Sequence, residues 1–232
     1  MTVAVADALL NAEPSDTEDI RQQLIDRMQY WGRLYPDAGY GGSFYGWLFD
    51  DDPHPYGSYG NGAAMRVSPA GWLYEDLYRT RLVARLTAEV SHNHIEGLRG
   101  AESVASAIFL ARAGASRREI RDYITHEFGY DLSFTCNALR PSYRFDPSCQ
   151  GTVPAAIVAF MDGNDFEDCV RNAISLGGDS DTLGCITGSI AEAFYGIPQT
   201  LIDECRARMT REMLSVVDDF YARIRPAKTR KP

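Results

Sequence analysis

Apolar residues recur at intervals of three and four along most of the chain, the spacing that an amphipathic α-helix requires. Ile20, Leu24 and Met28 follow this spacing after the segment 15–18, whose sequence fits a capping box. A second capping box, at 116–119, precedes a pattern that predicts a helix over residues 117–128. No strand-like alternation extends beyond a few positions. The pattern therefore predicts an all-α fold.

Further segments have the same helical period. We expect helices over residues 82–90, 101–113, 152–162 and 166–176, and a last helix with one apolar face made of Ile202, Cys205, Met209, Met213, Val216, Phe220 and Ile224. The first ten residues, MTVAVADALL, are apolar on most sides and lack an N-cap residue, so they resemble the interior of a buried helix.

Two long segments lack helical periodicity, residues 35–72 and residues 131–151. Loops of this length in a compact domain are usually functional. We therefore expect a compact single-domain, multi-helix fold over residues 1–225, with two long functional loops on one side. The basic residues 226–232 are expected to form a disordered tail.

Composition excludes several classes of function. The 232 residues carry a net charge of -9, which argues against nucleic acid as the main partner. No apolar run approaches the roughly 20 residues that span a bilayer, and no basic segment marks a signal peptide. The 5 cysteines are widely spaced and form no CxxC pair. They are typical of reduced thiols, so we expect a cytoplasmic protein with no membrane partner.

The stretch GGDSDT places Asp179 and Asp181 before a helix rich in Gly, Ala, Ser and Thr. Clustered oxygens are the ligands of hard cations such as Mg²⁺, Mn²⁺ and Ca²⁺, and the Thr182 hydroxyl adds a third oxygen. The alternative is that the carboxylates only cap a helix N-terminus. Because buried helices rarely begin with two free carboxylates, we favour a metal site.

Two further stretches are candidates for ligand binding. In SYGNGAAMRVSP, Gly60 and Gly62 flank Asn61, and backbone amides in such loops can bind phosphate, with Arg66 adding positive charge. Alone, such a loop is more often a simple turn. In AEVSHNHIEG, the Glu-x-x-His spacing that ends at His92 can ligate iron, but no second pair is present. We therefore expect this histidine to contact a ligand or a neighbouring residue.

One acidic run is interpreted as solvated. Asp50, Asp51 and Asp52 lie close to His54 in a Pro-rich segment, which superficially resembles a metal site. Runs of like charge in such segments are usually exposed to solvent. We therefore expect no metal there.

Taken together, SYGNGAAMRVSP, SHNHIEG with the Ala-rich helix that follows it, and GGDSDTLGCITGSIAEAFYG resemble the motifs of the ADP-ribosylglycohydrolase family and occur in the family's order. The resemblance covers essentially the whole chain. It implies an all-helical hydrolase that uses two Mg²⁺ or Mn²⁺ ions to release ADP-ribose from ADP-ribosylated proteins or small acceptors, at ribose C1″. By position it implies metal ligands at Asp179, Asp181 and Thr182, ADP-ribose-binding residues at Ser58, Tyr59, Gly60, Asn61 and Gly62, and a ligand contact at His92.

The start of the chain departs from the family's pattern. Family members carry a Gly-Asp motif and then Thr-Asp-Asp-Thr before a helix that MTVAVADALL resembles, and this chain contains no Thr-Asp-Asp-Thr. The first interpretation is a hydrolase whose other metal ligands and catalytic residues belong to a missing N-terminal segment. The second is a non-catalytic ADP-ribose-binding or structural remnant of the same fold, and a distant third is an unrelated helical metal-binding protein. The acceptor linkage and the oligomeric state stay open.

Overall fold

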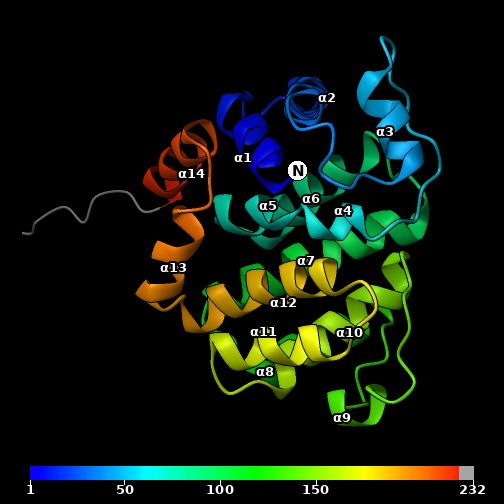
Figure 1. Ribbon diagram of the computed structural model, residues 1–232, viewed down its shortest axis with the longest axis vertical. Coiled ribbons are helices and arrows are strands. Elements are labelled where there is room, and N and C mark those ends of the chain that lie inside the picture. The colour runs from blue at the N-terminus through cyan, green and yellow to red at the C-terminus, as the bar shows by residue number, and fades with distance from the viewer. Residues whose placement is uncertain (225–232) are drawn as a thin grey trace, which may run out of the picture.

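The computed structural model describes residues 1–224, which form helices and no strand (Figure 1). The all-α prediction is confirmed. Within this range, no helix is both long and apolar enough to cross a bilayer. The helices are α1 (Thr2–Asn11), α2 (Thr17–Leu34), α3 (Gly42–Phe49), α4 (Gly62–Met65), α5 (Ser68–Leu73), α6 (Leu77–Glu89), α7 (Ile95–Arg112), α8 (Arg117–Phe128), α9 (Cys136–Leu139), α10 (Cys149–Asp162), α11 (Phe166–Ser175), α12 (Ser180–Tyr195), α13 (Gln199–Arg206) and α14 (Arg211–Ile224).

Helix α7 lies at the centre of the molecule and packs against α4, α5, α6, α8, α10 and α12 (Figure 1). Its buried face is rich in alanine, and Ala101, Ala105 and Ala107 are completely buried. Small side chains let neighbouring helices approach closely. At Gly71 of α5, an added Cβ would lie 2.7 Å from Ile108. The Ala-rich sequence thus produces a central helix that other helices surround.

Helix α1 is also a buried helix, as its apolar sequence predicts. Ala4, Val5 and Ala8 have no exposed surface, and α1 packs against α2, α5 and α14. Its acidic residue, Asp7, is compensated, because it accepts a hydrogen bond from Trp31 Nε1 at 2.9 Å and lies near the Arg27 guanidinium. A buried carboxylate without such partners would be costly.

Several predicted helix boundaries need correction. The capping box at Ser116 and the helix over residues 117–128 are confirmed, but the box predicted at Ser15 is wrong. Asp16 caps α2 instead, because its carboxylate accepts hydrogen bonds from Glu18 N and Asp19 N. The helices predicted from residues 82, 101 and 152 begin earlier, at Leu77, Ile95 and Cys149.

The predicted long loops contain helices, and the predicted last helix is broken. Helices α3 and α4 lie within residues 35–72, α5 begins there, and α9 lies within residues 131–151. The single helix expected from Ile202 to Ile224 is divided into α13 and α14. Tight turns join Arg208 N to Cys205 O and Met209 N to Arg206 O. The expected basic tail lies outside the described residues.

Candidate functional site

Two consecutive glycines place the first carboxylate of the site. Gly177 and Gly178 both have positive φ angles, 74° and 63°, and they turn the chain into α12. Gly178 also allows a close approach, since an added Cβ would lie 2.9 Å from Tyr143 and 3.0 Å from the Arg144 carbonyl oxygen. Asp179 is the N-cap residue directly before α12 and is half-buried. The sequence Gly-Gly-Asp therefore fixes where this side chain enters the site.

The loop around Asn61 lies directly against Asp179. The Asn61 amide donates one hydrogen bond to Asp179 Oδ2 at 2.6 Å and another to Thr152 Oγ1 at 2.9 Å. The loop is also joined to the start of α10: Asn61 N donates to Pro147 O, and Cys149 N donates to Tyr59 O. Hydrogen bonds thereby join the segments around residues 60, 148 and 179, at the starts of α4, α10 and α12.

The two acidic residues of this motif interact with each other. Burial raises the pKa of Asp179, the Asn61 amide opposes the increase, and a hydrogen bond with the neighbouring Asp181 carboxyl raises this pKa further. Asp181 itself is exposed. Thr182 is buried, and its hydroxyl lies within hydrogen-bonding range of the Asp179 carboxylate and 3.5 Å from Met65 Sδ. Two adjacent carboxylates with a hydroxyl beside them make a negatively charged, oxygen-rich corner.

His92 closes the other side of the loop. It is 5% exposed, and its Nδ1 lies 2.8 Å from Ser91 Oγ. Its Nε2 lies 3.4 Å from the position that a Cβ on Gly60 would take, and 3.8 Å from that position on Gly62. Both glycines therefore leave open the space that this nitrogen faces. The Glu-x-x-His pair does not form, because Glu89 is ion-paired with Arg21 at 3.2 Å.

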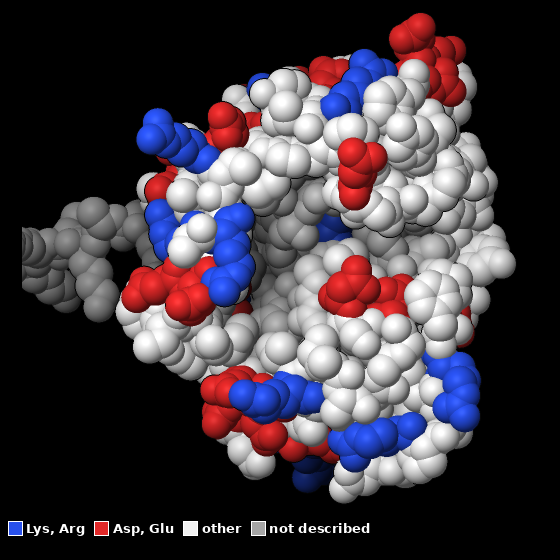
Figure 2. All heavy atoms as spheres, viewed as in Figure 1, with Lys and Arg blue, Asp and Glu red and all other residues white. Residues whose placement is uncertain are grey.

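The remaining predicted ligand contacts, Ser58 and Tyr59, directly precede Gly60 in the same loop. Ser58 Oγ accepts a hydrogen bond from Gly60 N at 3.1 Å. The Tyr59 side chain is 50% exposed and packs edge-on against the His94 ring. The sequence-predicted residues of the loop, Asp179 and His92 are thus gathered in one region of the fold. On the face drawn in Figure 2, acidic side chains stand on both sides of a central hollow.

The carboxylates of Asp179 and Asp181 fit a hard divalent cation, but such an ion would need further ligands besides them. Asp179 and Asp181 supply anionic oxygens, and a cation would relieve the repulsion between them. Among residues 1–224, no group of three or more His, Cys, Asp or Glu side chains could hold a metal ion. The Asp50–Asp52 run is exposed to solvent, as predicted, and Asp52 and His54 pair with each other at 3.2 Å.

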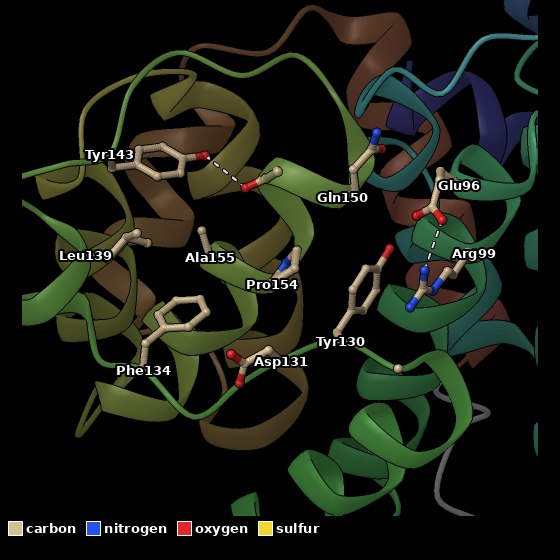
Figure 3. A pocket seen from close by; sticks show the side chains of 12 residues that line it. Glu96, Arg99, Tyr130, Asp131, Phe134, Leu139, Tyr143, Gln150, Pro154 and Ala155 are labelled. Carbon is tan, nitrogen blue, oxygen red and sulfur yellow. Dashed lines mark hydrogen bonds and ion pairs between the residues drawn. The ribbon is translucent and has the colours of Figure 1, made fainter.

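A cavity of about 470 Å³ adjoins the site and was not predicted from the sequence (Figure 3). Tyr143 links the two, because its ring lies against Gly178 and its hydroxyl donates to Gly151 O. In Figure 3 the Tyr130 hydroxyl points toward the space between Gln150 and Glu96. The cavity wall is contributed by Glu96, Arg99, Gly129, Tyr130, Asp131, Phe134, Leu139, Tyr143, Gln150, Gly151, Pro154 and Ala155. No periodicity in the sequence brings these segments together.

The polar contacts behind the loop were also missed. Asp146 contributes its backbone carbonyl to Thr152 Oγ1 at 2.9 Å, and Thr152 in turn accepts from Asn61. Arg66 was predicted to supply charge to the loop, but its guanidinium is turned inward and is 2% exposed. The only sequence signal for this burial was the position of Arg66 within an otherwise apolar segment of small residues.

Comparisons with known proteins identify the family of this chain. The family model for ADP-ribosylglycohydrolase matches residues 1–230. The chain is 28% identical to ADP-ribosylhydrolase ARH3 of Gallus gallus, over 71% of this chain and 58% of that protein. It is 26% identical to the ADP-ribosyl-[dinitrogen reductase] glycohydrolase of Rhodospirillum rubrum, over 73% of this chain and 58% of that protein. It therefore spans just over half of the length of either relative.

A solved structure has the same fold. An "ADP-ribosylglycohydrolase-related protein complex" superposes with a TM-score of 0.73 and 26% sequence identity, covering 96% of this chain and 79% of that one. The family model and this structure both extend over nearly all of the described helices. The chain belongs to the ADP-ribosylglycohydrolase family.

Proposed function

We propose that this chain binds ADP-ribose and contributes to its hydrolytic release from an ADP-ribosylated protein or small acceptor. The observation that carries the proposal is the hydrogen bond from Asn61 to Asp179, which joins the ligand-binding loop to the acidic motif. Binding residues and metal-binding residues must lie side by side if a cation is to act on the bound sugar. The names of the relatives, an ADP-ribosylhydrolase and a glycohydrolase, support the same reaction class.

Different residues of the site would bind the metal and the ligand. Asp179, Asp181 and Thr182 would hold Mg²⁺ or Mn²⁺ together with ligands from elsewhere. Bound there, the metal would polarise ribose oxygens and lower the pKa of a water molecule. The loop from Ser58 to Gly62 would bind the diphosphate and the distal ribose. The exposed Tyr59 ring offers a flat apolar surface to the ligand, and His92 offers a ring nitrogen beside Gly60.

Other properties support a protein substrate or small acceptor over nucleic acid. The net charge of -9 disfavours a polyanionic partner. We propose that the chain works in a reducing compartment such as the cytoplasm, since Cys136, Cys149, Cys169, Cys185 and Cys205 are all free thiols.

Two measurements test the proposal. Titration calorimetry with ADP-ribose should detect binding that Tyr59→Ala weakens, whereas Tyr78→Ala, which removes an exposed tyrosine from α6, should not weaken it. Release of free ADP-ribose from Arg-linked and Ser-linked substrates, with Mg²⁺ or Mn²⁺ present, tests catalysis. Binding without release would favour the non-catalytic alternative, and absence of both would contradict the proposal.

A further inference from the structure

A chain of buried polar groups connects Arg66 to His92. Arg66 Nη2 donates to the Thr87 carbonyl oxygen at 2.8 Å and to Ser91 Oγ at 2.7 Å. Ser91 Oγ lies 2.8 Å from His92 Nδ1. Arg66 and Ser91 are at most 2% exposed, so bulk water does not compete for these hydrogen bonds. These hydrogen bonds, from Arg66 through Ser91 to His92, form a relay. It runs from the interior to the imidazole ring that faces the ligand-binding loop.

Counting protons along the relay identifies the histidine tautomer. Arg66 can only donate, so one lone pair of Ser91 Oγ is used as an acceptor. Within residues 1–224, His92 Nδ1 is the other partner of Ser91 Oγ, and it is the only one able to accept the hydroxyl proton. Donation from Ser91 to Nδ1 is therefore the arrangement that leaves the buried Ser91 hydroxyl proton paired. A neutral ring that accepts at Nδ1 carries its proton on Nε2.

The surroundings of the ring favour its neutral form. Burial, and then the positive charge of Arg66, lower the pKa of His92 to about 3. Tyr56 lies against the ring with centroids 5.7 Å apart, and burial raises its pKa. Cys149, behind Gly60, also has a raised pKa, about 12, mainly through burial. The remaining neighbour, Phe44, is uncharged. No carboxylate pairs with Arg66 or His92 among the described residues, so nothing nearby stabilises an imidazolium.

We propose that Arg66 and Ser91 are positioning residues that hold His92 as a neutral hydrogen-bond donor, with its Nε2–H directed at the ligand space beside Gly60 and Gly62. The ligand itself, ADP-ribose, rests on the proposed function. A donor of this kind binds a ribose hydroxyl or phosphate oxygen. Because its protonation state does not change around neutral pH, it binds equally well on both sides of the ordinary histidine pKa.

Nuclear magnetic resonance of ¹⁵N-histidine-labelled protein tests the relay without any ligand. The ring nitrogens of His92 should report the neutral Nε2–H tautomer throughout about pH 5 to 8. The exposed His54 and His126 serve as internal references in the same spectra. Ser91→Ala should remove this single-tautomer signature and leave the two exposed histidines unchanged. Ser106→Ala is the matched control, because it also removes a buried serine hydroxyl, in this case one on α7. An Nδ1–H tautomer, or ordinary titration, in the wild-type protein would overturn the relay.

Titration of ADP-ribose then tests the ligand contact. Ser91→Ala should weaken ADP-ribose binding about three- to tenfold, as expected for one misaligned hydrogen bond, and Ser106→Ala should not. If the tautomer is as expected but Ser91→Ala binds ADP-ribose as well as the wild type, the contact is overturned. If the wild-type chain binds no ADP-ribose, the proposed function fails, and the spectra alone decide whether the relay is correct.

Discussion

The side-chain nitrogen of Asn61 lies 2.6 Å from Oδ2 of Asp179, although the two residues are 118 positions apart in the sequence. The second amide proton of Asn61 is used by Thr152 Oγ1. Asn61 is thus a buried donor with both protons committed, and one of them stabilises a carboxylate. This arrangement couples the shape of the ligand loop to the charge of the acidic motif.

Replacement of Asn61 should destabilise the fold as well as the site. Asn61→Ala removes two hydrogen bonds and leaves Thr152 and Asp179 without this donor, so we expect a loss of about 1–3 kcal/mol in the free energy of unfolding. Urea denaturation measures it. Asn164→Ala removes an exposed side-chain hydrogen bond and should cost less than about 0.5 kcal/mol. Equal losses in the two variants would contradict the structural role of Asn61.

Asp179 should make stability depend on pH. Its pKa in the folded chain is raised above the value of about 3.9 for an unfolded aspartate, mainly by burial. Its protonated form is therefore favoured by folding, and the stability that this contributes is lost as the pH rises through the folded-state pKa. Asp179→Asn should accordingly be more stable than the wild type at pH 7 without divalent ions, and the difference should shrink below about pH 4.

Thermal unfolding across this pH range tests that expectation. Asp51→Asn removes the same charge from an exposed position and serves as the control. A wild-type chain that gains stability relative to Asp179→Asn on going from pH 4 to pH 7 would have the opposite sign and would refute the argument.

The features that could be predicted from sequence are those set by local periodicity and by short motifs. Helix α8 matches its prediction because Ser116 and Glu119 form a reciprocal cap within four residues. The start of α12 was found because Gly-Gly-Asp encodes its own turn. Asn61 was named as a loop residue, but its partners Thr152 and Asp179 depend on how distant helices pack.

The missed features are the ones that depend on tertiary contacts. The relay through Ser91 joins the ends of α4 and α6, and nothing in the local sequence distinguishes this serine from a surface one. Helices α3, α4 and α5 are too short for a clear period, and only burial of residues such as Leu48 and Ala63 stabilises them. Short helices in a Gly-rich segment are therefore hard to distinguish from loops.

The acidic motif should bind Mn²⁺ weakly and in one place. Two carboxylates and a hydroxyl are too few to enclose a divalent ion, so we expect dissociation constants of about a millimolar. Water-proton relaxation measures Mn²⁺ binding directly. Asp181→Asn should abolish detectable binding, since it removes half of the anionic oxygens. Asp52→Asn, in the exposed acidic run beside His54, should leave binding unchanged. If only Asp52→Asn lost Mn²⁺ binding, the ion would be bound at the exposed acidic run, and the prediction for Asp179 and Asp181 would be wrong.

The two glycines before Asp179 should differ in how well they tolerate alanine. Both have positive φ angles, so each Gly→Ala variant pays roughly 1–2 kcal/mol for placing an L-residue in left-handed backbone. At Gly177 nothing lies within 4 Å of the new Cβ, whereas at Gly178 the Cβ meets Tyr143 and the Arg144 carbonyl oxygen. Overpacking of this kind adds about 1–3 kcal/mol, because the backbone atom cannot move aside as a flexible side chain does.

Denaturant unfolding of both variants isolates this clash, since Gly177→Ala reports the backbone cost alone. Gly178→Ala should be the less stable of the two. It should also displace Asp179 from Asn61, and so weaken Mn²⁺ binding by more than Gly177→Ala does. The reason is that Gly178 is the last residue before the carboxylate, and any shift that relieves its contact with Arg144 moves the start of α12. Equal stability of the two variants would show that the segment around Tyr143 and Arg144 yields without cost, and that the position of Asp179 does not depend on it.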